Sequence, residues 1–275
     1  RGCFQGTAIE CRGTVISYAA FDEATDRIAV QLQKTGVGPG KIAAVRMRRS
    51  EKMVMAIFGV LKAGAAVMTV NADMPEERFR SLRLSCGASV VLDEASVEAI
   101  LSAARGERFS IADLKMAQEN DPAMVLATSG TTGRPKGVCQ SQRSLSILFD
   151  QFPYHLTDIG IIPAEYNAVI GHIQQGYIVA YHYEYPSALL NGKKLVLLTE
   201  EEQVSIQAFC EIVEKNDRCL LAMIPSQFAV LIGDKRFRAA ANHITSLNFF
   251  AEPVPENLKK EIRAVFPETT TVHEL

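Results

Sequence analysis

The sequence predicts an α/β fold in which stacked, mostly parallel sheets are covered by helices. Short apolar runs of strand length alternate along most of the chain with longer segments whose apolar residues recur at helical spacing. Strands that alternate with helices usually pair in parallel, because each helix carries the chain back to the same end of the sheet. The chain has 275 residues, 48% of them hydrophobic, so it can bury a large core.

The first part of the chain alternates regularly. Residues 18–34 place apolar side chains on one helical face, and the glycine-rich stretch 36–40 predicts the turn that ends this helix. Ser50 is suited to cap the next helix, and Gly64 and Gly87 stand where helix ends often need a left-handed residue. Together these signals predict helices at 18–34, 51–63, 73–86 and 96–104, strands at 42–47, 65–70 and 88–92, and an irregular connector at 105–122.

The second part is regular except in one region. Between Tyr154 and Tyr185, aromatic residues and histidines show no clear period, and we expect the substrate region there. Residues 200–202, three glutamates, are expected to form a solvated turn. Elsewhere the pattern predicts a helix capped by Ser141, strands at 194–198, 220–224 and 247–250, helices at 205–215, 227–232 and 255–265, and an extended segment at 269–273.

The stretch Thr128-Ser-Gly-Thr-Thr-Gly-Arg-Pro-Lys-Gly137 has the chemistry of a phosphate-binding loop. Its glycines let backbone N–H groups approach an anion closely, and its hydroxyl groups add donors. Lys136 supplies a mobile positive charge for phosphate oxygens. The spacing differs from that of a Walker loop, because Arg134 and Pro135 separate Gly133 from Lys136, whereas a Walker lysine directly follows its glycine. A flexible linker is disfavoured, since the stretch lies between two apolar, strand-like runs.

The run 128–137 resembles the ATP loop of the adenylate-forming superfamily, which includes acyl-CoA synthetases, luciferases and the adenylation domains of non-ribosomal peptide synthetases. Residues 61–78, 188–192 and 225–226 are similar to further segments of that family. The resemblance implies the large N-terminal domain of the adenylate-forming fold, truncated, with a lobe boundary suggested near 105–122. It also implies that the family's small C-terminal domain is absent from residues 1–275.

The resemblance further implies that the chain uses ATP and Mg²⁺, with Lys136 as the catalytic residue that meets the charge on the transferring phosphoryl group. The segment 250–253 is similar to the family segment that lies against the adenine ring, although Phe250 and Ala251 depart from its usual glycines. Glu252 could equally cap the following helix. The implied ATP-binding residues are Thr128, Ser129, Gly130, Thr131, Thr132, Gly133, Lys136, Ala251 and Glu252.

The acid is expected to be something other than an ordinary α-amino acid. Amino-acid-activating members of the family carry a Phe-Asp pair whose carboxylate meets the substrate ammonium, because an unpaired buried ammonium costs several kcal/mol. Counting back from 188–192 places Val179 at the aspartate, whereas counting forward from Asp158 places Asn167 there. Neither is acidic, so Asn167 and Val179 are the predicted substrate-binding residues for an aryl, hydroxy or short acyl acid. Alternatively, Asp158, Glu165 or Glu184 takes the role of the carboxylate.

The resemblance implies ATP-dependent activation of a small-molecule carboxylic acid as an acyl-adenylate, followed by transfer to CoA or to carrier-protein pantetheine. The family's aromatic-Gly-x-Thr-Glu motif would follow the extended segment 269–273, but the chain ends at Leu275. We therefore expect an N-terminal portion of a carboxylate ligase that is inactive alone. The alternative is a non-catalytic nucleotide-binding or scaffolding domain.

Several other classes of function have no support in the sequence. The net charge is −2 and no dense Lys/Arg run occurs, so no nucleic-acid partner is expected. No His/Cys cluster predicts a metal site within the protein, and no Gly-x-Ser-x-Gly elbow predicts a hydrolase. The six cysteines form no C-x-x-C pair, and no signal peptide or membrane span is evident. These features favour a cytoplasmic protein without a membrane partner.

Overall fold

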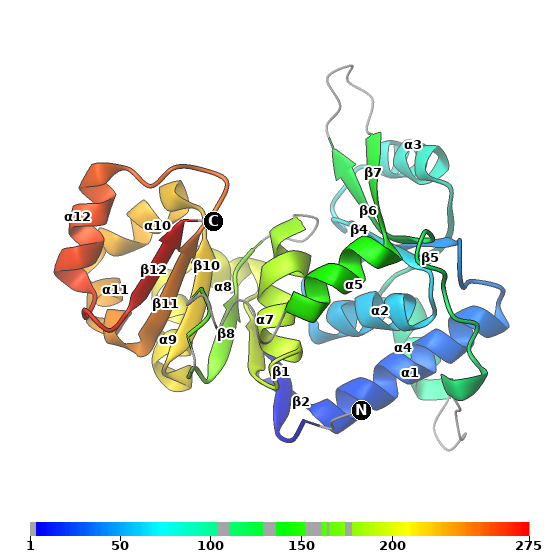
Figure 1. The fold of residues 1–275 in the computed structure, drawn as a ribbon, viewed down its shortest axis with the longest axis horizontal. Coiled ribbons are helices and arrows are strands. Elements are labelled where there is room, and N and C mark those ends of the chain that lie inside the picture. The colour runs from blue at the N-terminus through cyan, green and yellow to red at the C-terminus, as the bar shows by residue number, and fades with distance from the viewer. Residues whose placement is uncertain are drawn as a thin grey trace. The chain divides into compact units, whose positions relative to one another are not determined.

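The computed structural model describes residues 4–103, 111–128, 136–151, 161–163, 165–173 and 178–274. The chain divides into two compact units (Figure 1). Unit 1 consists of Arg1–Gln5, Ile16–Leu148 and Gln175–Ile178, and unit 2 consists of Gly6–Val15, Phe149–Gln174 and Val179–Leu275. Residues 111–122, where the sequence suggests a lobe boundary, belong to unit 1. No described helix is long and apolar enough to cross a membrane.

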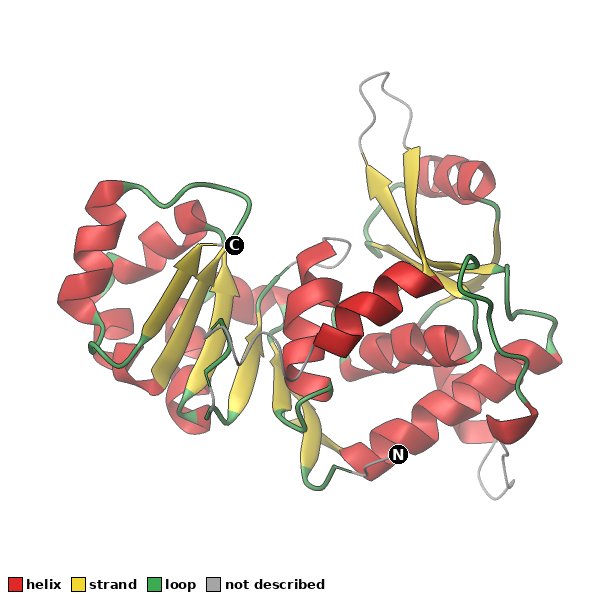
Figure 2. Ribbon diagram, viewed as in Figure 1, coloured by secondary structure: helices red, strands yellow, loops and turns green. Residues whose placement is uncertain are grey.

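Unit 1 is built on a five-stranded sheet with helices packed against it (Figure 2). Its strands, in spatial order, are β5 (Ala88–Leu92), β3 (Ile42–Arg46), β4 (Ala66–Val70), β6 (Pro122–Thr128) and β7 (Lys136–Ser141). The first four are parallel to their neighbours, and β7 is antiparallel to β6. The helices are α1 (Tyr18–Lys34), α2 (Glu51–Lys62), α3 (Glu76–Cys86), α4 (Glu94–Ala103) and α5 (Gln142–Gln151), with a 3₁₀ turn η1 (Ile111–Asp113).

The helices of unit 1 lie on both faces of its sheet. The chain passes from β3 through α2 to β4 on one side, and from β4 through α3 to β5 on the other side of β3. Right-handed crossovers in opposite directions place α2 and α3 on opposite faces. Phe79 and Leu82 of α3 are buried against strand residues such as Met68. On α2, a side chain at Gly59 would lie 2.5 Å from Ile28 Cγ2, so the glycine lets α1 and α2 pack closely.

Unit 2 is built on a seven-stranded sheet in the order β12-β11-β10-β8-β9-β1-β2. From β12 to β1, every pair of neighbours is parallel. The strands are β1 (Thr7–Cys11), β2 (Thr14–Ser17), β8 (Ala168–Gly171), β9 (Lys194–Leu197), β10 (Cys219–Met223), β11 (Ile244–Phe249) and β12 (Thr271–Glu274). The helices are α7 (Tyr185–Leu189), α8 (Glu200–Val204), α9 (Ile206–Asn216), α10 (Pro225–Ile232), α11 (Lys235–Ala240) and α12 (Glu256–Val265), with a π-helix η2 (Ala180–Glu184) and a 3₁₀ turn η3 (Ala241–His243).

One face of this sheet carries the main apolar core of unit 2. Leu221 of β10 and Leu247 and Phe249 of β11 are buried there, together with apolar side chains of α9, α10, α11 and α12. Phe228 of α10 lies at the centre of an aromatic group, with its ring centroid 5.1 Å from that of Phe249 and 5.6 Å from that of Phe237. These four helices therefore share one face of the sheet.

The direction of the chain across the sheet reverses at β8. The strand β9, which follows β8 in the chain, lies on one side of it, and β10, which follows β9, lies on the other side. Right-handed crossovers that run in opposite directions lie on opposite faces of a sheet. The helices η2 and α7 therefore cover one face, and α8 and α9 cover the other. Parallel sheets bind ligands at the carboxyl ends of their strands next to such a reversal. The fold of unit 2 thus favours a site beyond the ends of β8 and β10.

Most expected elements are confirmed, and three expectations need correction. Residues 200–202 are not a solvated turn but begin α8, which Thr199 and Glu202 cap reciprocally with hydrogen bonds of 3.2 and 2.8 Å. The helix expected from Asp73 begins instead at Glu76, after Pro75. The irregular region after Tyr154 contains β8 and η2, which the sequence did not predict.

Candidate functional site

The hairpin of β6 and β7 carries the predicted phosphate loop in unit 1. The backbones of the two strands pair from Pro122 and Ser141 to Thr128 and Lys136, which stand opposite each other (Figure 1). Antiparallel pairing up to this point brings the two ends of the loop together. The residues between them, including the predicted ATP-binding residues Ser129, Gly130, Thr131, Thr132 and Gly133, lie outside the described residues.

The base of this hairpin is packed tightly against α3. A side chain at Gly137 would place its Cβ 2.7 Å from Cys86 Sγ and 3.0 Å from Val125 Cγ1, so close that the neighbouring atoms would have to shift. Cys86 is the last residue of α3, and Gly137 is the second residue of β7. The glycine therefore serves a second purpose besides loop chemistry, because it lets the strand that begins at Lys136 lie directly against the helix.

In unit 2, the predicted adenine-binding segment follows the carboxyl end of β11. Ala251 has φ of +70°, a left-handed conformation that costs a residue with a Cβ roughly 1 kcal/mol and that glycine adopts freely. Glu252 accepts hydrogen bonds of 3.2 Å from both the backbone N–H and the hydroxyl of Ser226, in the first turn of α10. Its carboxylate thus caps α10 rather than the next helix in the chain, α12.

Replacing Ala251 by Gly should stabilise the protein by about 1 kcal/mol, because glycine removes the strain of the left-handed backbone. The midpoint of urea unfolding should rise. Gly233 provides a matched control with the reverse substitution. Its φ of −67° is one that alanine adopts readily, so Gly233→Ala should introduce no backbone strain. A lower midpoint for Ala251→Gly would contradict the strain at this position.

The two predicted substrate-binding residues lie on either side of β8 in the chain. Asn167 is exposed just before the strand, where its backbone N–H donates to the carbonyl of Arg218 at 3.0 Å. Val179 comes after the carboxyl end of β8 and directly precedes η2. The structure therefore does not bring Asn167 and Val179 together. Because ligands bind at carboxyl ends of parallel strands, the position of Val179 is the more suitable one.

The acidic residues considered as substitutes for the missing aspartate have other partners. Glu184 is fully buried, and its Oε1 accepts hydrogen bonds of 2.8 Å from the backbone N–H groups of His172 and Ile173. It thereby holds the turn that leaves β8. Glu165 pairs with Arg218 at 2.8 Å on the surface, before β8 begins. Asp158 lies outside the described residues.

The environment of η2 disfavours charge. Burial lowers the pKa of His182, so its imidazole is neutral at pH 7. Burial, with smaller contributions from Tyr166 and Glu184, raises the pKa of Tyr183 well above its ordinary value. The phenol of Tyr166 donates to the carbonyl oxygen of Ser187 at 2.6 Å. An apolar or uncharged polar ligand group suits these surroundings better than an ammonium.

Sequence analysis missed one polar group in this unit. Ser246 and Asn248 are buried on β11, and His273 stands beside Asn248 on β12. The alternation of polar and apolar residues along 246–249 was a visible signal, but such alternation ordinarily indicates a polar face turned to solvent rather than a buried one. Among the described residues, no group of three or more His, Cys, Asp or Glu side chains is placed to hold a metal ion.

Comparisons with known proteins agree with this architecture. Tyrocidine synthase 2 of Brevibacillus parabrevis is 28% identical over 94% of this chain, which spans only 7% of that protein. The N-terminal subdomain of Klebsiella oxytoca NpsA, in complex with 3-hydroxyanthranilyl-AMSN, has a TM-score of 0.82 at 20% identity and is matched over 98% of this chain and 68% of that chain. The non-ribosomal peptide synthetase FmoA3 in an AMPPNP-bound form has a TM-score of 0.80 at 22% identity, over 98% of this chain and 29% of that chain.

The structural likeness places the fold among the N-terminal subdomains of adenylation domains. The sequence also matches a protein family described as AMP-binding enzyme over residues 3–275, almost the whole chain. The chain therefore belongs to the AMP-binding enzyme family.

Proposed function

We propose that the protein containing this chain uses ATP to activate a carboxylic acid as an acyl-adenylate and then passes the acyl group to the thiol of carrier-protein pantetheine or of CoA. The observation that carries this proposal is the family match over residues 3–275, which includes the phosphate loop. It is supported by the likeness to a synthetase that binds AMPPNP, a non-hydrolysable relative of ATP. The chain spans only 7% of tyrocidine synthase 2, so transfer to an acceptor thiol is proposed for the complete protein and not for residues 1–275.

The loop residues act on the triphosphate by positioning and charge. Backbone N–H groups at Gly130 and Gly133, with hydroxyl groups from residues 128, 129, 131 and 132, hold phosphate oxygens. Lys136 neutralises the charge that develops as the acid oxygen attacks the α-phosphorus and pyrophosphate leaves. Mg²⁺ brought with the triphosphate would supply further positive charge there. The protein has little covalent chemistry to perform, because alignment of the acid with the α-phosphorus supplies most of the rate.

The activated acid is one without an α-ammonium group. On the count back from residues 188–192, Val179 takes the position at which amino-acid-activating relatives carry a carboxylate, and Glu184 is already engaged by two backbone N–H groups. A buried ammonium without such a partner would cost several kcal/mol. We therefore expect an aryl, hydroxy or short acyl acid.

Acid-dependent exchange of pyrophosphate into ATP by the complete gene product tests both parts of the proposal. Exchange should require ATP, Mg²⁺ and an acid, and each proteinogenic amino acid should be a poorer substrate than its des-amino analogue. Clear preference for an α-amino acid would contradict the assignment of the acid. ATP binding without exchange for any acid in a broad panel would instead indicate a nucleotide-binding or scaffolding domain without turnover.

A further inference from the structure

The start of β7 lies against the end of α3 in unit 1 (Figure 1). A Cβ atom placed on Gly137 would stand 2.7 Å from Cys86 Sγ and 3.9 Å from Cys86 Cβ. Non-bonded carbon atoms pack best at about 3.5–4.0 Å, so no side chain at Gly137 fits beside the sulfur. The thiol of Cys86 therefore fills the space that a side chain on this strand would need.

The helix α3 supports β7 at the start of the strand. In the spatial order of the five-stranded sheet β7 comes last, and it pairs with β6. Residues two apart in a strand share a face, so Cys139 stands on the same face as Gly137. Cys139 is exposed, which shows that α3 does not cover the middle of the strand. The distance between helix and strand is thus set where Gly137 meets Cys86.

Cys86 itself is firmly held. Phe79 and Leu82 anchor α3 in an apolar core of unit 1, and Cys86 packs against the same core. Gly87, with φ of +72°, ends the helix directly after Cys86 in a left-handed conformation. A small side chain on a helix that is fixed in this way is a rigid support for a neighbouring strand.

The position of Gly137 bears directly on Lys136. Across the hairpin, Gly137 stands opposite Ala127, and Lys136, the residue before it, stands opposite Thr128. Adjacent residues of a strand are about 3.3 Å apart, so a movement of Gly137 away from α3 carries the backbone of Lys136 with it. A displacement of about 1 Å at a reacting group can slow a reaction about 10²-fold.

We propose that Cys86 is a positioning residue for acid activation. Its thiol sets how closely the start of β7 approaches α3, and thereby where the backbone of Lys136 lies. This inference rests on the proposed function, because that function assigns Lys136 to the charge that develops on the triphosphate. The sulfur acts through its size and undergoes no chemical change.

The test introduces a methyl group into the contact with Gly137→Ala and measures acid-dependent pyrophosphate exchange by the complete gene product. The value of kcat should fall about tenfold or more, because the added Cβ displaces the start of β7. Adding Cys86→Ala, which removes the sulfur, should raise kcat again by about threefold or more. The recovery should be incomplete, because Val125 Cγ1 also lies 3.0 Å from the added Cβ.

Cys86→Val should fail to restore activity to Gly137→Ala. In a helix, valine keeps one rotamer, in which its two methyl groups fill both of the positions that a cysteine sulfur usually takes. The valine therefore cannot turn away from the added methyl group. Leu84 lies on the same helix and is 75% exposed, so Leu84→Ala is a matched control that should restore nothing either.

A second set of variants shows whether the contact acts through the lysine. Adding Gly137→Ala to Lys136→Ala should lower kcat by less than about twofold, because no lysine remains to be misplaced. A general defect in folding would instead lower kcat by the same factor with and without Lys136.

Cys86→Phe keeps the inference testable if Gly137→Ala does not fold. Its ring extends beyond the position of the sulfur, so kcat should fall about threefold or more. Leu84→Phe introduces the same ring at an exposed position of α3 and should stay within about twofold of the wild type. Equal exchange by Cys86→Phe and the wild type would count against a positioning role.

The remaining outcomes separate the two levels of the account. Unchanged exchange in Gly137→Ala, a loss that Cys86→Ala does not relieve, or equal losses with and without Lys136 would overturn this inference and leave acid activation standing. Absence of exchange with every acid in the wild type would contradict the proposed function and this inference together.

Discussion

Replacing Lys136 by Ala should lower kcat/KM for adenylation by the complete gene product by a factor of about 10²–10³, equivalent to about 3–4 kcal/mol of transition-state stabilisation. The lysine follows a loop of glycines and hydroxyl groups, and its backbone pairs with Thr128 at the end of the β6–β7 hairpin. Most of the loss should appear in kcat, because the charge that the lysine meets grows as pyrophosphate leaves. Exchange kinetics at saturating ATP measure this directly.

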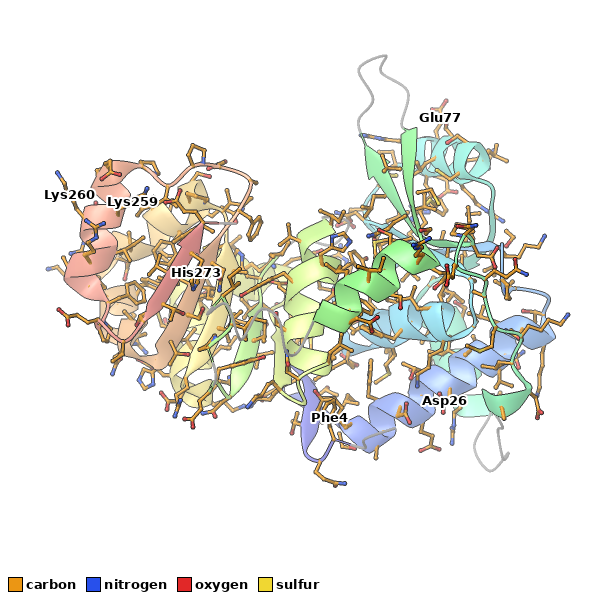
Figure 3. The ribbon with its side chains drawn as sticks, viewed as in Figure 1. Phe4, Asp26, Glu77, Lys259, Lys260 and His273 are labelled. Atoms are coloured by element: carbon orange, nitrogen blue, oxygen red, sulfur yellow. The ribbon has the colours of Figure 1, made fainter. Side chains whose placement is uncertain are left out.

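Lys260 provides the control for loss of one positive charge. It is exposed on α12 of unit 2 (Figure 3), far along the chain from the loop, and Lys260→Ala should leave exchange within about a factor of two. Lys136→Arg is the informative intermediate, because a guanidinium keeps the charge but differs in shape. Unchanged adenylation in Lys136→Ala would show that the loop does not act on the triphosphate as described.

Replacing Phe228 by Ala should destabilise the protein by about 3–5 kcal/mol, the usual cost of removing a buried aromatic ring and leaving a cavity. Phe228 has no solvent exposure, and its ring lies within 5.1 to 6.0 Å of the rings of Phe249, Phe237 and Phe266. These rings join α10, α11, β11 and the end of α12 in one core. The loss should appear as a large fall in the urea midpoint of the transition that unfolds unit 2.

Val230 lies on the same helix and is 68% exposed, so Val230→Ala should change the free energy of unfolding by no more than about 0.5 kcal/mol. The comparison separates packing from helix propensity, because both variants place alanine on α10. A cost below about 1 kcal/mol for Phe228→Ala would contradict a close-packed core around that ring.

Elements with a strong period were predictable from sequence. The helix α1 and the strand β5 have the predicted bounds, because amphipathic spacing, a cap at Ser17 or a glycine after the helix end defines them locally. The helix α8 could also have been found, since Thr199 and Glu202 form a capping box that the sequence displays. The three consecutive glutamates instead suggested a solvated turn.

The region of β8 and η2 could not be predicted for a physical reason. A π-helix has a hydrogen-bond spacing that matches neither the period of a strand nor that of an α-helix, and Tyr181, Tyr183 and Glu184 are all buried on it. Glu184 is held by backbone groups of residues 172 and 173, which no local pattern indicates. Pairing between distant residues, rather than propensity, defines this part of the fold.

A candidate site could be proposed from the sequence in its chemistry but not in its contacts. A phosphate loop could be proposed because the residue types that suit it stand in one continuous run. In contrast, Glu252 meets Ser226, 26 residues away in the chain, and the neighbours Asn248 and His273 come from two different strands. Burial of Asn248 became evident only from the assembled sheet, since a polar residue in an alternating strand is ordinarily taken to face water.

Transfer of an oxygen atom from the acid to AMP tests the central claim most directly. The complete gene product is incubated with ATP, Mg²⁺ and its best acid labelled with ¹⁸O in the carboxylate, and the phosphorus products are analysed by mass spectrometry after hydrolysis. Attack of the carboxylate on the α-phosphorus, with pyrophosphate as leaving group, predicts an acyl-AMP intermediate and ¹⁸O in AMP. Label in inorganic phosphate with ADP as the other product, or no label in either, would contradict acyl-adenylate formation.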